Sequence, residues 1–594
     1  MSPLLLMILV FFGYIVMYRI YGRYISRVIF RVNKKAKVPA SIMRDDFDYI
    51  PTKKHIVFSH HFTSIAGTGP IVGPAIAIIW GWVPAVLWVF FGSIFIGAVH
   101  DFGVLIVSMR NKGYSIAQIT GIYLSRRTKI FLFIIGLLEL WIFIAILGLV
   151  MAIIFDLYPG TVLTVWLEIP IAILLGFFVM KKGRSYIAFS LLALLVMYLT
   201  IGIGYFVPIR LTEAFGIPAT GLWTIILLVY AFVASILPVT TLMQPRDSIN
   251  AHQLLLAMGL LVAGTAMVTF SQNLIFVAPA YDSGPVGAPS LWPFLFIIIA
   301  CGAVSGFHAL VSSGTTSKQI SRENDALFVG YGSMLTEGAL AILVIIAVAA
   351  GLGLGFTTPD GEVLYGLEAW GSNYGSWGAA SGMTGKLAAF VEGSANIMTG
   401  LGIPKSFGVL IMGVVVASFA GTSLDTSVRM QRFFLQELFG KQLTKNTVKT
   451  VNPINNHYFA TAIVVISAAL LAFSTGFGGE GALLLWPLFG NINQVLAALG
   501  LVILTLYLKE KNGYGWLVTA IPAALMCVMS LWAAIANQLN FWQAQNLMLF
   551  FVNFIILILA VWVIMEAQIA FFRKKAKTAD FSATAKSRTP EKMP

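Results

Sequence analysis

Runs of about 20 consecutive apolar residues, the length that a helix needs to cross the hydrocarbon core of a bilayer, recur almost from end to end of this chain. Of its 594 residues, 58% are hydrophobic and only 10% are charged. Soluble globular proteins are nearer one-quarter charged. The chain is therefore predicted to be an all-α polytopic membrane protein, and the apolar runs leave no room for a sizeable soluble domain.

Apolar runs bounded by charged residues or by Gly and Pro predict about fifteen transmembrane spans. Their approximate ranges are 3–22, 56–79, 82–109, 129–156, 161–180, 185–208, 219–241, 253–277, 292–313, 326–355, 404–424, 455–475, 481–508, 514–536 and 546–571. Residues 386–403 are assigned to an outside or re-entrant helix, because one more full span would reverse the predicted orientation of all the spans that follow. We expect residues 1–572 to form a single transmembrane domain and residues 573–594 a short, polar, disordered cytoplasmic tail.

The net charge of +14 lies mainly in alternate short gaps between the spans, as the positive-inside rule requires of cytoplasmic loops. Arg429 and Arg432 are placed in one such gap. This distribution argues against a nucleic-acid partner. The first span has its basic residues after the apolar run, the reverse of a cleaved signal peptide. The N-terminus is therefore predicted to lie outside and the C-terminus in the cytoplasm.

The second and ninth spans contain helix-breaking residues. The second has Gly67, Gly69 and Pro70 in mid-run, and the ninth carries Gly and Ser residues over 302–314. Such breaks are tolerated at membrane depth where the freed backbone faces protein or a wet cavity. The two spans cross in opposite directions, which predicts inverted halves beginning near residues 56 and 292 and a transport site at the breaks. The alternative is irregular packing without function.

Freed amides and half-helix N-termini at such breaks suit a substrate carboxylate. The predicted substrate-binding residues are Ser64, Gly67, Thr68, Gly69, His308, Ser312, Gly314 and Thr315. The stretch Trp486–Gln494 is also predicted to break its span and to supply amides at depth, either to the substrate or to packing. Few Lys or Arg residues lie at mid-membrane, which mildly favours a zwitterionic substrate over a small anion.

Ionisable residues inside a bilayer are costly, and their presence suggests function. His60, Glu139 and Asp425 lie in or beside apolar runs, and the residues predicted to carry a coupling proton are His61, His100, Asp101 and Glu337. An unpaired carboxyl at that depth favours its neutral form, which suits a proton carrier, and histidine can titrate near neutral pH. The alternative is that each caps a helix or completes a buried hydrogen bond.

A metal site is not predicted, because the sequence has no HExxH motif and no Cys/His ligand spacing. Cys301 and Cys527 both lie inside apolar runs, which argues against a disulfide framework. The acidic run 44–49 before the second span could bind a cation, form loop salt bridges or act as a cytoplasmic gate.

Several long stretches resemble the carbon starvation protein A (CstA) family of peptide transporters. They are residues 45–52, 60–74, 100–102, 244–247, 306–318 and 486–490. The resemblance implies peptide uptake during nutrient limitation, a stress response, in the cell inner membrane. It also implies kinship with the amino acid–polyamine–organocation superfamily and its LeuT-like inverted repeat. A close branch of the family carries pyruvate with protons.

These inferences predict a secondary active transporter that imports small peptides by alternating access, coupled to protons, with sodium as the other candidate ion. The protein is not expected to be an enzyme, and no cofactor is predicted. A pyruvate/proton symporter is the main alternative, and a membrane-embedded metalloenzyme or a channel is more remote. The lipid bilayer is an expected partner, and the oligomeric state is left open.

Overall fold

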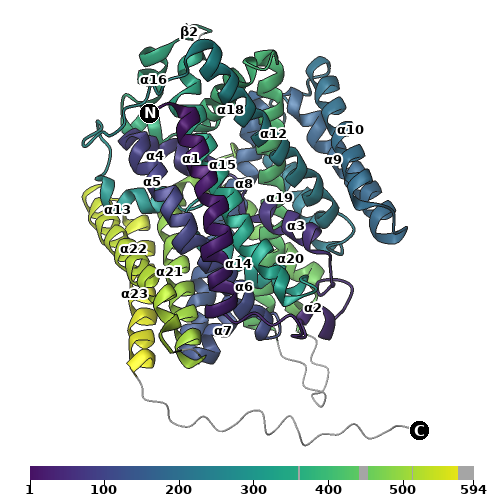
Figure 1. Cartoon of the computed structure of the whole chain (residues 1–594), viewed down its shortest axis with the longest axis vertical. Coiled ribbons are helices and arrows are strands. Elements are labelled where there is room, and N and C mark those ends of the chain that lie inside the picture. The colour runs from purple at the N-terminus through teal and green to yellow at the C-terminus, as the bar shows by residue number, and fades with distance from the viewer. Residues whose placement is uncertain (359–360, 441–451, 512, 573–594) are drawn as a thin grey trace, which may run out of the picture.

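A computed structural model describes residues 1–358, 361–440, 452–511 and 513–572. The predicted tail, 573–594, lies outside these residues, as does part of the predicted cytoplasmic gap at 441–451. The described chain is mostly helical and forms one bundle of upright and tilted helices (Figure 1). The N-terminus and the end of the last helix lie at opposite ends of this bundle. We call these the amino-terminal end and the opposite end.

The first half of the chain forms twelve α-helices. They are α1 (Pro3–Met17), α2 (Pro39–Ile42), α3 (Lys54–Ile65), α4 (Gly69–Ala77), α5 (Trp82–Gly92), α6 (Ala98–Arg110), α7 (Ile116–Tyr123), α8 (Arg126–Leu157), α9 (Gly160–Gly176), α10 (Tyr186–Phe206), α11 (Ala219–Ile236) and α12 (Met243–Gln272). Short π-helical turns extend α1 as far as Ile29 and join α5 to α6, so each of these pairs of segments forms one long rod.

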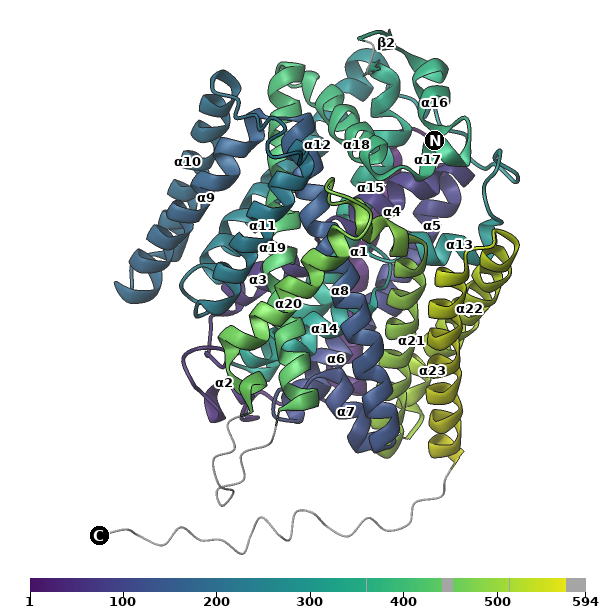
Figure 2. The same ribbon diagram turned by 180° about the vertical axis from the view of Figure 1, so that it is seen from behind.

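The second half forms eleven α-helices and one small antiparallel hairpin. The elements are α13 (Leu291–Ile298), α14 (Gly306–Gly314), α15 (Gly332–Ala349), β1 (Phe356–Thr357), β2 (Val363–Leu364), α16 (Gly366–Tyr374), α17 (Trp377–Ser381), α18 (Met383–Thr399), α19 (Lys405–Phe439), α20 (His457–Ala472), α21 (Trp486–Lys511), α22 (Leu517–Gln543) and α23 (Leu547–Phe572). The hairpin and α16 lie at the amino-terminal end (Figure 2).

The predicted membrane class is confirmed, and each predicted span falls on a helical segment. Twelve helices in the described residues are long and apolar enough to cross a bilayer, or thirteen when the bent pair α3–α4 counts as one span. This number is smaller than the predicted one for two reasons. The ninth span is divided into two short helices, α13 and α14, and α20 is an apolar helix of 16 residues.

Two local predictions are wrong, and one helix is longer than its predicted span. The break in the ninth span lies between Ile298 and Gly306, because residues 306–314 form a regular helix. The stretch that starts at Trp486 begins α21 and does not interrupt it, since a 3-10 segment, Glu480–Leu485, precedes it. Helix α19 also extends beyond the predicted eleventh span to Phe439, and Arg429 and Arg432 are buried within it beside Asp48.

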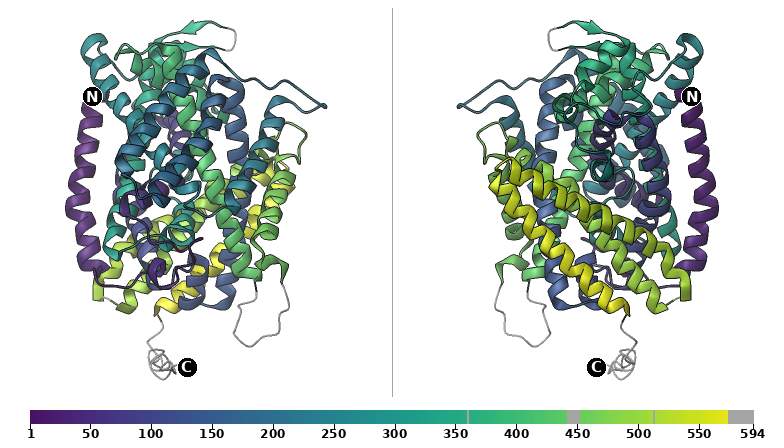
Figure 3. Two further views of the ribbon diagram at one scale, coloured as in Figure 1. Left: turned by 90° about the vertical axis from the view of Figure 1, so that its right-hand side faces the viewer. Right: turned by 90° about the vertical axis from the view of Figure 1, so that its left-hand side faces the viewer.

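The helices divide into a buried centre and an apolar periphery. α15, α19 and α21 are almost entirely covered by other helices. The hairpin α9–α10 stands at one side of the bundle and α22–α23 at the other (Figures 1 and 2), and α1 runs upright along one edge (Figure 3). These outer helices expose Leu, Ile and Phe side chains, as helices that face lipid do. The polar side chains at mid-depth therefore face one another.

The two broken segments run in opposite directions. Ile50, just before α3, donates its backbone N–H to the carbonyl oxygen of Lys318, just after α14, at 3.2 Å. At the other end of the bundle, the indole of Trp80, just after α4, donates to the carbonyl oxygen of Pro289, just before α13, at 3.1 Å. Each segment thus starts where the other finishes, which is the antiparallel relation expected of inverted repeats.

Candidate functional site

The first broken segment leaves unpaired amides at mid-depth. α3 ends at Ile65, α4 begins at Gly69, and the two axes differ by 44°. Pro70 stands at the start of α4, where it has no N–H to contribute. The backbone N–H groups of Gly67, Thr68 and Gly69 donate to no described residue. These N–H donors lie at the positive end of the α4 dipole, where they can bind an anionic group.

The second broken segment is irregular over residues 299–305. The side chain of Asn493 on α21 supports it, because its Oδ1 accepts the N–H of Phe307 at 2.8 Å and the hydroxyl of Ser305 at 3.1 Å. The N–H groups of Ala300 and Cys301 have no acceptor among the described residues. A second set of free donors therefore lies at the break between α13 and α14.

The two breaks touch each other through glycines. A Cβ atom placed on Gly69 would lie 2.5 Å from the sulfur of Cys301, and one placed on Gly73 would lie 2.4 Å from the carbonyl oxygen of Ile298. Distances this short exclude any side chain at either glycine. Because only glycine lets the two backbones approach so closely, the free amides of both segments converge on one region.

A cavity of about 600 Å³ adjoins both breaks. Its polar lining includes Thr68, Cys301 and Asn493, and its walls include Phe143 and Phe294. Further lining comes from Gly69, Val72, Gly73, Ile76, Ile146, Gly287, Ala288, Pro289, Ile297, Ile298, Ala300, Trp377, Ser381, Trp486, Pro487, Phe489, Gly490, Asn537 and Asn540. The described residues that line it include no charged side chain. The cavity therefore offers free amides, side-chain amides and aromatic rings.

A chain of buried ionisable groups lies behind the second break. His308 on α14 stands between two carboxylates, with its Nδ1 2.8 Å from Asp101 and its Nε2 3.3 Å from Glu337. The second Asp101 oxygen is 2.9 Å from Nδ1 of His100, and Glu337 accepts the N–H of Gly302 at 3.0 Å. These four side chains have no solvent exposure. Because Gly302 belongs to the break, the chain connects the irregular backbone to three helices, α6, α14 and α15.

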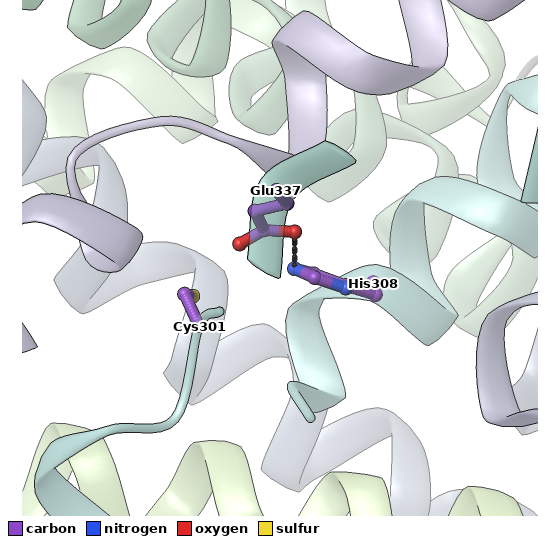
Figure 4. Close-up of side chains that lie close together, drawn as sticks. All are labelled: Cys301, His308 and Glu337. Carbon is purple, nitrogen blue, oxygen red and sulfur yellow. Dashed lines mark ion pairs between the residues drawn. The ribbon is translucent and has the colours of Figure 1, made fainter. Parts of the chain in front are cut away.

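Figure 4 shows His308 and Glu337 facing one another, with Cys301 beside them. Ligand atoms of these three residues lie within 4.8 Å of one another, a grouping that the sequence did not predict. Three donors are one short of a closed tetrahedral zinc site. The His308 ring is also held between two carboxylates, and the Cys301 thiol points to Ser305 at 3.5 Å. The arrangement is that of a relay of ionisable groups, in which His308 is hydrogen-bonded to Asp101 and forms an ion pair with Glu337.

The predicted substrate-binding residues are divided by the structure. Thr68 and Gly69 line the cavity, whereas Gly67 packs against α19, since a Cβ there would be 2.6 Å from the hydroxyl oxygen of Ser423. Ser64 contacts Thr426 of α19 at 3.2 Å. The remaining residues, His308, Ser312, Gly314 and Thr315, are all buried in or just after α14 and do not line the cavity.

Two adjacent histidines tie α3 to its neighbours below the break. His60 pairs through Nδ1 with Asp247 of α12 in a short contact, and its Nε2 is 3.1 Å from the Thr315 hydroxyl. His61 lies 2.9 Å from the Thr316 hydroxyl through Nδ1, and its Nε2 has no described partner. Both histidine rings thus join α3 to the residues that directly follow α14.

A second buried charge network was missed in the sequence analysis. Arg246 of α12 lies 2.7 Å from Asp425 on α19 and 3.2 Å from Glu168 on α9, and it donates to the Tyr230 hydroxyl at 2.6 Å. Arg246 is thus a buried cation inside the bundle, and both carboxylates already engage it. Glu168 within the fifth apolar run was the available signal, because a buried carboxylate predicts a cationic partner.

The opposite end of the bundle is closed by the acidic run before α3. Asp48 pairs with Arg429 at 2.7 Å and approaches Arg432 at 3.9 Å. Next to this pair, Thr52 donates its N–H to the carbonyl oxygen of Gln319 at 2.9 Å. Of the three interpretations of this run, the structure favours salt bridges that seal the end of the bundle.

A lid of short helices covers the amino-terminal end. The Tyr374 hydroxyl of α16 donates to the carbonyl oxygen of Ala75 in α4 at 2.5 Å, and Trp377 of α17 lines the cavity. The ammonium of Lys386 on α18 donates to the carbonyl oxygen of Asn373 at 2.9 Å and lies 3.7 Å from the centre of the Tyr374 ring. The lid therefore contacts the half-helix whose N-terminus faces the cavity.

The fold and this site define a class: a polytopic helical membrane protein in which two oppositely directed, broken helices meet at a cavity, the design of secondary transporters. The chain belongs to the carbon starvation protein CstA family, which matches residues 2–358 and 366–533. This match confirms the resemblance found in the sequence.

The relatives are transporters by name. The chain is 34% identical to the peptide transporter CstA of Campylobacter jejuni, over 90% of this chain and 80% of that protein. It is 32% identical to the pyruvate/proton symporter BtsT of Escherichia coli, over 88% of this chain and 79% of that protein. Among solved structures, MhsT in complex with L-phenylalanine covers 87% of this chain and 99% of its own, with 11% identity and a TM-score of 0.48.

Proposed function

We propose that this protein is a secondary transporter that imports small peptides across the inner membrane, coupled to protons, by alternating access. The observation that carries the proposal is that the free amides of two broken helices meet on one cavity, directly beside a buried chain of two carboxylates and two histidines. Backbone at this depth can bind cargo and the buried chain can bind a proton. Because these two parts lie close together, proton binding to the buried groups can influence substrate binding to the backbone.

The substrate carboxylate is proposed to bind the N–H groups of Thr68, Gly69, Ala300 and Cys301. Backbone donors at a helix N-terminus bind anions without a fixed positive charge. Phe143 and the other aromatic rings of the wall would then contact apolar side chains of the peptide. Ser64, Ser312, Gly314 and Thr315 lie toward the opposite end, where they are proposed to line the exit path in the inward-facing state.

The proton is proposed to reside on the chain of Asp101, His308 and Glu337. Both ring nitrogens of His308 point at carboxylates, so the three groups together hold one proton more easily than none. Glu337 also holds the N–H of Gly302, which belongs to the break. A change in the protonation of Glu337 would therefore alter the backbone that lies against the substrate. His61 and His100 are proposed to assist from α3 and α6.

A pyruvate/proton symporter is the second candidate, and the similarity to BtsT favours it. Two features favour peptides. The cavity of about 600 Å³ lies in the middle of the roughly 300–1,000 Å³ range of small-molecule sites, more space than a three-carbon acid needs. Arg246, a buried cation that could hold a small anion, is already engaged by Glu168 and Asp425.

The described conformation corresponds to the outward-facing state if the N-terminus lies outside. The cavity includes Trp377 and Ser381 from the amino-terminal lid, whereas Asp48 and Arg429 close the opposite end. Inward opening would require the Asp48–Arg429 pair to separate while the lid keeps its contact with α4. Enzymatic chemistry is not part of this proposal.

The test is uptake of labelled dipeptides, tripeptides and pyruvate into proteoliposomes, with and without an imposed pH gradient. We expect a dipeptide to accumulate when the outside is more acidic. Glu337→Gln should abolish proton-driven accumulation and leave dipeptide exchange intact, while the exposed-loop variant Glu362→Gln should behave as the wild type. Accumulation of pyruvate alone would reject the peptide assignment. Full accumulation by Glu337→Gln would remove this residue from the mechanism.

A further inference from the structure

The buried carboxyl of Glu139 stands apart from both charge networks. Glu139 lies in the middle of α8, has no solvent exposure, and neither of its carboxyl oxygens has a hydrogen-bond partner among the described residues. No ion pair reaches it in the described structure, although Asp101 and Asp425 each have at least one cationic or imidazole partner. An unpaired carboxylate in such a place would be very costly, so burial without a partner favours the neutral carboxyl.

The elements packed against α8 leave Glu139 without a charged neighbour. Their titratable and charged groups are Tyr123 on α7, Glu168 on α9, Tyr230 on α11, His308 on α14, Lys405, Asp425, Arg429, Arg432 and Glu437 on α19, His457 and Tyr458 on α20, Glu480 on the 3-10 segment before α21, Tyr507, Lys509, Glu510 and Lys511 on α21, and Glu566 on α23. No described hydrogen bond or ion pair joins any of them to Glu139. Its neutral form is therefore imposed by burial alone.

The position of Glu139 relates it to the cavity. Phe143 and Ile146 line the cavity, and they share a face of α8 with Glu139 because they follow it by four and seven residues. The Phe143 ring closes the cavity on this side, with its centre 4.5 Å from that of Phe307 and 5.4 Å from that of Phe489. Glu139 lies one helical turn, about 6 Å, beyond this aromatic floor, toward the opposite end of the bundle.

We propose that Glu139 is a second proton-binding site of the transport cycle, which is protonated while the aromatic floor is closed and releases its proton when the opposite side opens. In that step the carboxyl O–H bond breaks, the proton passes to water entering from the opposite side, and that water solvates the carboxylate left behind. The proposal rests on the proposed function. It adds a carrier on the exit side to the relay of Asp101, His308 and Glu337.

A purely structural role for Glu139 makes a different prediction. A neutral Glu and a Gln have nearly the same shape, so Glu139→Gln would preserve any packing function and leave coupling unchanged. If Glu139 carries a proton, the same variant folds equally well but loses the charged state that the cycle needs. Glu139→Gln therefore separates the two roles without depending on loss of folding.

The experiment compares the wild type, Glu139→Gln and the exposed control Glu362→Gln in proteoliposomes. We expect Glu139→Gln to match the wild type in thermal stability and in dipeptide exchange at equal pH, but to lose at least tenfold in accumulation driven by a pH gradient. Infrared difference spectra, recorded on adding dipeptide, should also lose one protonated-carboxyl band in this variant alone. Full accumulation together with an unchanged spectrum would overturn the proposal. Failure of the wild type to accumulate dipeptide would instead reject the proposed function.

Discussion

Gly73 of α4 lies directly against the backbone of Ile298 in α13, so close that a Cβ atom on the glycine would be 2.4 Å from the carbonyl oxygen. The neighbouring atom belongs to backbone, which cannot rotate away as a side chain can. This contact sets the separation of the two broken helices. It also determines the width of the cavity, because Gly73 and Ile298 both line it.

Gly73→Ala is therefore expected to separate the two half-helices. Overpacking of this kind costs roughly 1–3 kcal/mol, and the free amides of the two breaks would no longer converge. We expect a lower melting temperature and a loss of most dipeptide uptake. Gly259→Ala in α12 is the matched control, because nothing lies within 4 Å of the added atom. Equal losses of stability and uptake in both variants would show that any helix glycine matters, and would contradict a specific role for the contact between Gly73 and Ile298.

Asn493 is expected to bind the substrate through its side-chain nitrogen. Its Oδ1 supports Phe307 and Ser305, whereas its Nδ2 has no described partner and the residue lines the cavity. Asn493→Asp keeps the accepting oxygen but replaces the donor with a negative oxygen. We expect the KM for dipeptide to rise roughly tenfold, equivalent to ~1.4 kcal/mol. The comparison is Asn540→Asp at the exposed edge of the cavity, for which a smaller rise is expected.

Arg246 is expected to be essential for folding. Arg246→Met would leave Glu168 and Asp425 buried without a cation, and such a loss costs about 3–5 kcal/mol. Thermal unfolding of the purified protein in detergent measures this effect. Arg44→Met breaks an exposed pair with Asp46, for which we expect ~0–1 kcal/mol. Similar melting temperatures for the two variants would contradict the role given to the buried network.

The Asp48–Arg429 pair is expected to hold the opposite end closed. Asp48→Asn weakens the pair and should loosen the adjacent hydrogen bond from the N–H of Thr52 to Gln319. Hydrogen exchange of the peptide that contains residues 50–52 should become faster, roughly tenfold for each 1.4 kcal/mol lost. Asp46→Asn is the control, since Asp46 is exposed and pairs only with Arg44 among the described residues. Unchanged protection in Asp48→Asn would mean that the backbone contacts alone close this end.

Lys386 in the amino-terminal lid is expected to make stability depend on pH. Burial lowers the pKa of its ammonium from 10.5 to about 7, so between these values the unfolded chain holds a proton that the folded protein has released. Unfolding then binds protons, and stability rises as the pH increases from about 7 toward 10. Lys386→Met should flatten this part of the stability profile in thermal unfolding experiments. The loop variant Lys112→Met should keep the wild-type slope.

The length and spacing of the apolar runs determined the membrane class, the positions of the spans and the existence of two broken helices. These properties are local, because a run of apolar residues, a proline or a pair of glycines acts within one or two helical turns. The breaks near Gly67 and Gly302 could be located in this way. The exact limits could not, since Gly306 begins a helix where the sequence suggested further irregular backbone.

Only the tertiary structure decided which polar groups meet. Asp101, His308 and Glu337 come from three helices, and their side-chain contacts span more than 200 residues of chain between Asp101 and His308. The positive charge of Arg246 and Arg429 suggests that they lie in loops. Each is nevertheless buried, because carboxylates of other segments pair with it. The free energy of burying a charge depends on its partner, and the partner is a property of the packed bundle. The sequence therefore located the broken helices, and packing assembled the candidate site around them.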